Sequence, residues 1–305
     1  MTSKPSANLA FGALLLGAVG IGFAAVFAKL AVNADGLVDG VKLSPVAVAF
    51  WRMAFACPFF WFAVWRNKRR TKLPLSGSKP PNRTLLLPGF LFAIDMGVWH
   101  WSFEFTSVAN ATLEANVAAI IVPLVSFFFL GERFRPLFIV GALLALAGMA
   151  RLVGFSLAAE GDAWIGDLMG LGVASAYAGY LLSSKVLLGR HPVSFVMACA
   201  TTTCAVFLLI GAVLTPGRFF PVTAESWWFL IALAATAQIF GQGLIAVGMS
   251  RLPAGFSAVT LVLQPVVAAY LGWILLGQTM VPGQMVAGVV VIFGIVLARF
   301  GTVAA

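Results

Sequence analysis

Ionisable side chains stand at a few positions inside apolar runs of this sequence, most densely in AIDMGVWHWSFEF, residues 93–105. That stretch holds Asp95, His100 and Glu104 among Phe and Trp rings, and Arg52 has a similar setting in AFWRMAFA. A charge at the centre of a membrane helix costs on the order of 3 kcal/mol, so such groups normally face protein or a wet cavity. Two interpretations are open: a structural ion pair between Arg52 and Asp95, or proton coupling through Asp95. His100 titrates near neutral pH, although a lone histidine is more often structural.

Neutral polar and aromatic side chains are the candidates for substrate contact. Trp101 shares a helical face with Ile94, and an internal alignment of the chain sets Gln238 and Gln242 on a facing helix. Apolar walls with a few hydrogen-bonding groups suit a substrate that has an apolar side chain and polar ends, so Trp101 and Gln242 are the leading candidates. Further candidates for substrate binding are Tyr177, Tyr180, Thr260, Gln264, Asn110 and Glu114. Lys29 is a candidate for attracting a carboxylate, although snorkelling to water is the favoured explanation.

The sequence shows no recognisable catalytic or metal-binding motif. The three cysteines fall in apolar runs without a CxxC or Cys/His spacing, and the two histidines, His100 and His191, are predicted on opposite sides of the membrane. A membrane enzyme would need a clustered nucleophile, an acid/base pair or metal ligands, and is therefore disfavoured. A GxxxxGK loop is absent from the sequence, so direct ATP drive is unsupported and no cofactor is expected.

The elements that position these residues are predicted to be membrane helices. The chain has 305 residues, of which 61% are hydrophobic and only 10% are charged, whereas soluble domains carry about a quarter charged residues. Apolar runs of about 20 residues match the thickness of a bilayer core. The sequence therefore predicts an all-α integral membrane protein, with helices over residues 9–30, 44–65, 85–106, 110–130, 136–154, 166–188, 192–214, 226–248, 255–276 and 282–300.

The distribution of basic residues predicts the orientation. The loop at residues 66–84 holds seven of the 19 Lys and Arg residues, and basic loops stay on the cytoplasmic side. Ten helices then place both termini in the cytoplasm and Asp35 and Arg218 in outer loops. The same topology accounts for the net charge of +9, so nucleic-acid binding is not expected.

An internal repeat is visible when LGERFRPLFIVGALLALAGMARLV, from residue 130, is compared with LGQTMVPGQMVAGVVVIFGIVLARF, from residue 276. Three special-backbone residues coincide at a constant offset of 146, in the pairs Gly131 and Gly277, Pro136 and Pro282, and Gly148 and Gly294. Residues 1–154 and 155–305 thus hold five helices each, and an odd number inverts the second half in the membrane. Inverted repeats are typical of secondary transporters; a symmetric scaffold left by an old duplication is the alternative.

The chain resembles the EamA-type transporters of the drug/metabolite transporter superfamily. The LGER and LGQT turns, each followed by a Pro and spaced glycines, carry the resemblance, together with Arg52 early in the second helix after Pro45. The Trp-rich third helix and the basic loop are similar to those of bacterial aromatic amino acid exporters. The resemblance implies a cavity lined by helices 1, 3, 4, 6, 8 and 9, with helices 5 and 10 packed away from it. The second half departs from the pattern, with Gln278 aligned to Glu132 and Cys199 to Arg52, which argues against symmetric roles at these positions.

These observations predict a secondary transporter. It is expected to export amino acids, aromatic and other neutral or hydrophobic ones, or similar small metabolites across the bacterial inner membrane by alternating access. The alternatives are an exporter of another metabolite or drug class and a membrane-embedded enzyme. The expected partners are a small-molecule substrate and membrane lipids, and a monomer is compatible with the sequence.

Overall fold

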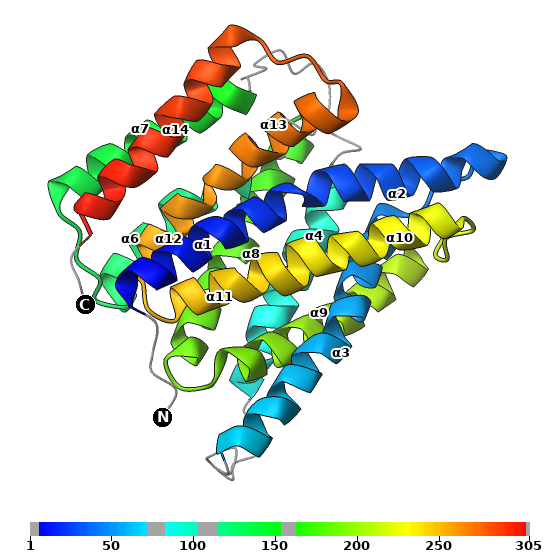
Figure 1. Ribbon diagram of the computed structural model, residues 1–305, viewed down its shortest axis with the longest axis horizontal. Coiled ribbons are helices and arrows are strands. Elements are labelled where there is room, and N and C mark those ends of the chain that lie inside the picture. The colour runs from blue at the N-terminus through cyan, green and yellow to red at the C-terminus, as the bar shows by residue number, and fades with distance from the viewer. Residues whose placement is uncertain (1–5, 72–82, 103–114, 154–162, 303–305) are drawn as a thin grey trace.

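The computed structural model describes residues 6–71, 83–102, 115–153 and 163–302, and this part of the chain is almost entirely helical (Figure 1). Eight helices in it are long and apolar enough to cross a membrane, and a further apolar helix is shorter. Large apolar side chains cover the outside: Phe128 is 73% exposed and Phe129 is 82% exposed. Such an apolar exterior suits contact with lipid rather than water, and the predicted all-α membrane fold is confirmed.

Each predicted helix has a counterpart, and several are divided into shorter pieces. In chain order the elements are α1 Ala7–Gly22, α2 Ala24–Asp39, α3 Pro45–Thr71, the short 3-10 helix η1 Arg83–Leu85, α4 Leu87–Ser102, α6 Ala118–Phe129, α7 Pro136–Val153, α8 Ala163–Leu188, α9 Val193–Leu214, α10 Ala224–Leu233, the π-helix η2 Ala234–Gln242, α11 Gly243–Met249, α12 Ala254–Leu261, α13 Leu263–Leu276 and α14 Pro282–Phe300.

The divided helices share a location in the middle of the bundle. The first helix is interrupted at Phe23, and the ninth at Val262. Pro265 lacks the backbone N–H that would continue the ninth helix, which explains that break. The fourth helix has a turn at residues 116–117. With the repeat offset of 146, residue 116 aligns with Val262. Breaks inside membrane helices expose backbone polar groups where a protein binds polar ligands.

Two predicted loops are wrong because the helices run further. The first span continues to Asp39 and ends at Gly40, which adopts a left-handed conformation with φ 76°. Asp35 therefore lies on α2 and is fully buried; the helix tolerates it because Arg218 and the Val222 N–H bind its carboxylate. The second span continues to Thr71, since the Lys and Arg residues that follow the apolar part are good helix formers in water.

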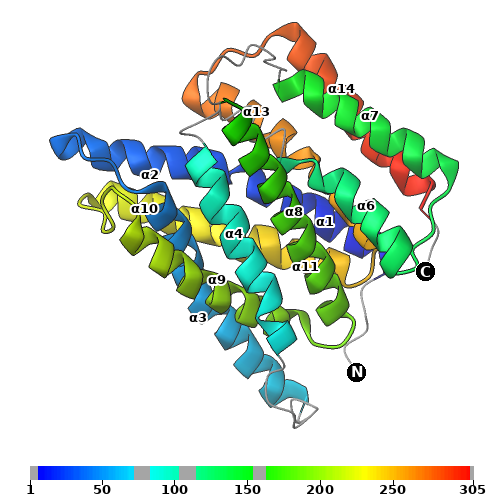
Figure 2. The ribbon, with the colours of Figure 1, turned by 180° about the vertical axis from the view of Figure 1, so that it is seen from behind.

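The two halves pack in a pattern that reflects the inverted repeat. The second helix packs against the seventh (α3 on α9), the fourth against the ninth (α6 on α12) and the fifth against the tenth (α7 on α14). The first packs against the eighth (α1 on η2 and α11), and the third against the sixth (α4 on α8). Figures 1 and 2 show these pairs from opposite sides. Every pair joins the two halves, so the centre of the molecule is the interface between them.

Helices α7 and α14 lie together at one edge of the bundle (Figure 1), as the family resemblance implies. Their backbones touch: a Cβ on Gly294 would lie 2.5 Å from the Ala145 nitrogen and 2.7 Å from the Gly141 carbonyl oxygen. Small residues spaced by four permit this close approach. Gly131 and Gly277, which precede the two helices, have left-handed φ values of 69° and 63°. The aligned glycines thus have the same backbone role in both halves.

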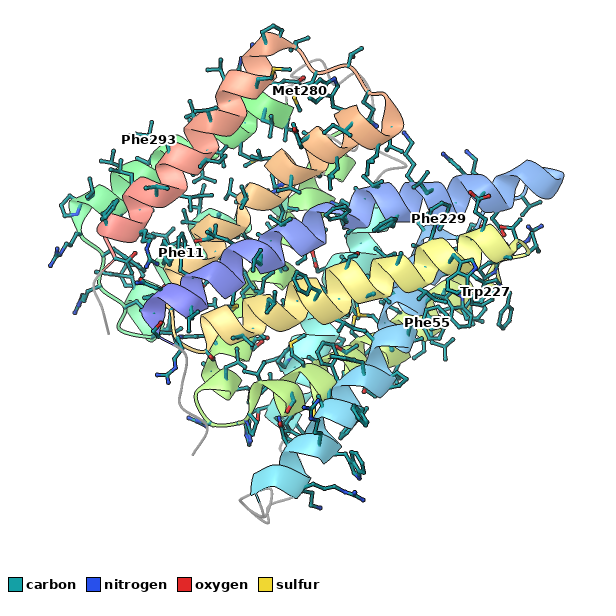
Figure 3. The ribbon with its side chains drawn as sticks, in the orientation of Figure 1. Phe11, Phe55, Trp227, Phe229, Met280 and Phe293 are labelled. Atoms are coloured by element: carbon teal, nitrogen blue, oxygen red, sulfur yellow. The ribbon has the colours of Figure 1, made fainter. Side chains whose placement is uncertain are left out.

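The two ends of the bundle differ in charge and composition. We call the end where α3, α8 and α14 finish the basic end; there Arg299 of α14 donates to Asn8 of α1, 2.6 Å away. At the opposite end, Ser44 N–H donates to the Arg218 carbonyl, which joins the loops beyond α2 and α9. Figure 3 shows Phe55, Trp227 and Phe229 gathered beside that end, where α2, α3 and α10 meet. Aromatic side chains of this kind are common at a membrane interface.

Candidate functional site

Polar side chains from both halves meet in the buried middle of the bundle. We call them the central polar cluster; they come from α3, α4, α8, η2 and α13 and are Arg52, Asp95, Tyr177, Tyr180, Gln242 and Gln264. Arg52 is 5% exposed, Asp95 6% and Gln242 2%. Burying polar groups costs free energy unless they find partners, so the partners of each member show what the cluster is built to do.

Tyr180 connects three helices within the cluster. Its hydroxyl donates to Gln242 Oε1 at 3.1 Å, and its ring stacks on Phe92 of α4 with centroids 4.5 Å apart. The ring of Tyr177, one turn earlier on α8, lies 5.9 Å from that of Tyr180. The Tyr177 hydroxyl lies near the side chains of Gln242 and Gln264. The two tyrosines therefore form an aromatic wall with hydrogen-bonding tips.

The two glutamines of the eighth span both lie on the π-helix η2. Gln238 Nε2 donates to Thr201 Oγ1 of α9 at 3.2 Å, while Gln242 faces Tyr180. A π-helix widens the turn and is frequent at functional sites. The aligned stretch of the third helix is an ordinary α-helix, α4, so the wider turn is a property of one half only.

Arg52 and Asp95 do not form the ion pair that was one interpretation of the sequence. Arg52 Nη1 instead donates to the Met96 sulfur, 3.8 Å away, and its guanidinium carbon lies 6.0 Å from the centre of the Phe92 ring. Asp95 is close enough to interact electrostatically with Arg52, Tyr177 and Tyr180. The cluster thus holds one basic and one acidic side chain, both buried and close to each other but not paired.

Several buried polar atoms in or beside the cluster have no hydrogen-bond partner within the described part of the protein. They are Arg52 Nε, Gln238 Oε1, Gln264 Nε2 and Ser184 Oγ. Folded proteins satisfy the large majority of such atoms. Their concentration here gives the cluster spare donors and acceptors for a polar ligand.

The remaining candidates from the sequence lie in other settings. Thr260 is fully buried, but its hydroxyl donates to the Phe256 carbonyl one turn back. Lys29 is exposed on α2, in line with snorkelling. Ile94, expected on the face of Trp101, is 37% exposed, whereas Asp95 is buried. The Trp101 and His100 side chains, and residues Glu104, Asn110 and Glu114, lie outside the described part.

Sequence reasoning missed two residues of the site, Phe92 and Thr201. Phe92 stacks on Tyr180 beside Arg52, and Thr201 binds Gln238. Phe92 precedes Asp95 by three residues, a spacing that places both on one helical face, so its position was accessible from the sequence. Thr201 had no such signal, because its role depends on how α9 packs against η2.

A pocket of about 600 Å³ opens at the basic end of the bundle. It lies between the halves and is lined by residues that include Glu132, Arg133, Lys185, Arg190, Arg251 and Pro253. Lys185 Nζ donates to the carbonyls of Met249 and Leu252 at 2.8 and 2.6 Å. Lys185 follows Tyr180 by five residues, or about 7.5 Å along a helix. The pocket therefore lies along α8 from the cluster, on the side of the basic end.

Glu132 has a structural role at this pocket. Its carboxylate accepts from the backbone N–H groups of Ala254 and Gly255 at 2.5 and 3.0 Å and so caps the N-terminus of α12. Gln278, its aligned counterpart, is exposed. The difference agrees with the asymmetry expected from the sequence.

Glu132→Ala is expected to lower the free energy of unfolding by about 1–2 kcal/mol, since it removes a helix cap and a charge that favours the helix N-terminus. Thermal unfolding in detergent measures the change. Gln278→Ala is the matched control at the aligned position and should leave the midpoint nearly unchanged. Equal midpoints for the two variants would contradict the capping role.

Comparisons with known proteins agree with this architecture. The sequence pattern of the EamA-like transporter family matches residues 8–154 and 164–300. A probable terminal-alkyne amino-acid exporter of Streptantibioticus cattleyicolor is 27% identical over 284 residues, 90% of this chain and 89% of that protein. The threonine/homoserine exporter RhtA of Escherichia coli K12 is 24% identical over 201 residues, 66% of this chain and 67% of that protein.

Two further comparisons extend these matches. The uncharacterized transporter YwfM of Bacillus subtilis is 29% identical over 224 residues, 68% of this chain and 71% of that protein. A solved crystal structure superposes with a TM-score of 0.77 over 98% of this chain and 99% of its own, at 21% sequence identity, which speaks for the fold alone. Because the family pattern covers most of both halves, this membrane protein belongs to the EamA-like transporter family.

Proposed function

We propose that this transporter exports amino acids, or similar small amphipathic metabolites, by alternating access. The observation that carries the proposal is the central polar cluster, which lies between two inverted halves and combines aromatic walls with spare hydrogen-bonding atoms. Secondary transporters built from inverted repeats bind substrate near the midplane, at the junction of the repeats. The names of two relatives, both amino-acid exporters, support the same substrate class.

The aromatic lining favours a neutral or hydrophobic substrate side chain. Phe92, Tyr177 and Tyr180 present ring faces in the cluster, and Gln242 supplies a polar contact beside them. Trp101, six residues after Asp95 on α4, is proposed as a further aromatic contact for the substrate. A substrate with an apolar side chain and charged ends would use both kinds of surface.

Outward transport is proposed because two relatives are named exporters, and the proposed orientation gives the route. We place the basic end in the cytoplasm of a bacterial inner membrane, because Lys and Arg collect on that side. Both chain termini then face the cytoplasm. We propose that the pocket at the basic end is the cytoplasmic approach to the cluster, and that rocking of one half against the other closes it and opens the opposite end.

The test is exchange of radiolabelled Phe, Leu, Met and Thr in proteoliposomes preloaded with unlabelled amino acid. Gln242→Leu is expected to reduce exchange at least about tenfold, since it removes the partner of the Tyr180 hydroxyl and leaves that group unsatisfied. Trp101→Ala is expected to reduce exchange of Phe more than that of Thr. Gln284→Leu, at the edge of the bundle, is the control: its amide donates to the Leu152 carbonyl and is remote from the cluster.

Each outcome of this experiment has a consequence. Saturable exchange that Gln242→Leu abolishes and Gln284→Leu retains supports the proposed site. A dependence on a pH gradient would support a coupling role for Asp95 and His100. If correctly folded protein exchanges none of the four amino acids, the substrate class is wrong, and metabolites or drugs of another class become the substrates to examine.

A further inference from the structure

We propose that Arg52 binds the carboxylate of the transported substrate and that Asp95 receives its ammonium group. The inference rests on the proposed function, since it names how the central polar cluster recognises an amino acid. It assigns a substrate contact to the second helix, which the family resemblance does not include in the cavity. It also predicts which analogues of an amino acid the transporter rejects.

The N–H donors of Arg52 lack strong hydrogen-bond acceptors. A guanidinium carries five N–H donors in a planar fork, yet Nη1 meets only the thioether of Met96 and Nε has no partner in the described part of the protein. A thioether sulfur is a weak acceptor. A carboxylate, in contrast, accepts two parallel hydrogen bonds from the fork, so it is the ligand that best fits these free donors.

The surroundings of Arg52 do not neutralise its charge. Phe92, Tyr177, Tyr180 and Cys204 stand around it and supply no anion, and Asp95, which is also close, forms no ion pair with it. A ring at 6.0 Å contributes only a weak cation–π attraction. A buried cation without a paired anion is strongly unfavourable, and a bound carboxylate would supply the missing anion.

Asp95 explains why the ligand should be a zwitterion. It is buried near Arg52 but forms no ion pair with it, so the cluster offers a basic and an acidic group at two separate places. An amino acid brings one carboxylate and one ammonium and leaves the net charge of the cluster unchanged. An amine or a carboxylic acid alone would add one unbalanced charge in a medium of low dielectric constant, where charges interact strongly.

The second half of the repeat does not supply a second arginine, so the proposed carboxylate site occurs once. The position aligned with Arg52 in the second half is Cys199, a neutral residue on α9 that cannot replace a guanidinium. One substrate carboxylate is therefore bound at a time, on the side of the cluster formed by α3 and α4.

The experiment compares competitors that differ in one end group. Exchange of radiolabelled L-phenylalanine in proteoliposomes is inhibited with unlabelled L-phenylalanine, with L-phenylalaninamide, which lacks the carboxylate, and with 3-phenylpropanoate, which lacks the ammonium. Wild-type protein should prefer the amino acid over either analogue by at least about tenfold. Arg52→Met should weaken competition by the amino acid about 10- to 100-fold and remove its advantage over the amide.

Further variants separate recognition from folding. Arg52→Lys keeps the charge without the fork and should retain part of the preference, and Arg52→Gln replaces Arg52→Met if that variant does not fold. Asp95→Asn should reduce the discrimination against 3-phenylpropanoate and leave that against the amide. Arg66→Met, at an exposed position of the same helix, is the control and should behave like the wild type.

The ratio between competitors decides the inference. A purely structural Arg52 would lower the maximal rate for every substrate and leave the ratio of amino acid to amide as in the wild type, which would overturn the inference. Wild-type protein that exchanges phenylalanine but is inhibited equally by the amide would overturn it too, with the proposed function intact. Folded wild-type protein that exchanges no amino acid would overturn both.

Discussion

Asp35→Ala is expected to lower the free energy of unfolding by about 3 kcal/mol, the low end of the range for removing one partner of a buried ion pair. The Asp35 carboxylate is fully buried and accepts from Arg218 Nη1 at 3.2 Å and from the Val222 N–H at 2.7 Å. The Arg218 side chain is 17% exposed, so water recovers part of the loss. Unfolding in detergent, monitored by heat or by titration with denaturing detergent, measures the change.

Two controls make the Asp35 result interpretable. Glu225→Ala removes an exposed carboxylate from the first turn of α10, near the same end of the bundle, and should cost less than about 1 kcal/mol. Arg218→Met, alone and combined with Asp35→Ala, completes a double-mutant cycle that isolates the pair. A cycle with no coupling energy would show that the two side chains act independently and would contradict a stabilising ion pair between α2 and the segment that follows α9.

Gly20→Ala is expected to destabilise the protein by about 1–3 kcal/mol, the usual cost of adding a methyl group to a packed interface. A Cβ at Gly20 would lie 2.8 Å from the Thr236 carbonyl oxygen and 3.1 Å from the Gly241 Cα. Both are backbone atoms of η2, so α1 and η2 must move apart. Because η2 also carries Gln238 and Gln242, transport should fall in the same variant.

Gly12→Ala is the matched control on the same helix. A Cβ at Gly12 would meet nothing within 4 Å, and alanine is about 1 kcal/mol better than glycine in a helix interior. The two substitutions are therefore expected to change the thermal midpoint in opposite directions. If both stabilised the protein, α1 and η2 would not be in close backbone contact.

The helices were predictable because a helix that crosses a lipid bilayer needs about 20 consecutive, mostly apolar residues. Runs of apolar residues located the helices, eight of which in the described part of the chain are long enough to span a membrane. The aligned glycines located the repeat; Gly131 and Gly277 have matching left-handed backbones. The errors lie at the ends of helices. Asp35 reads as a loop residue in sequence because its partner, Arg218, is 183 residues away.

The members of the site were predictable, but their pairing was not. Arg52, Asp95, Tyr177, Tyr180, Gln242 and Gln264 stand out as polar groups in apolar runs, and the structure brings them together. Which atoms meet depends on the rotation of each helix about its axis. Ideal helical spacing places Ile94 inward, yet it is 37% exposed, and the face with Phe92 and Asp95 is the buried one.

The sequence by itself determined the membrane class, the helices and the internal repeat of this protein, because each depends on local hydrophobicity or on a regular offset. Only the tertiary structure decided that Arg52 faces Met96 instead of pairing with Asp95, and that Glu132 caps a helix of the other half. These contacts join residues distant in the chain. Their geometry follows from side-chain packing between helices, including the wider turn of the π-helix η2. Such packing leaves no periodic pattern in the sequence from which it could be predicted.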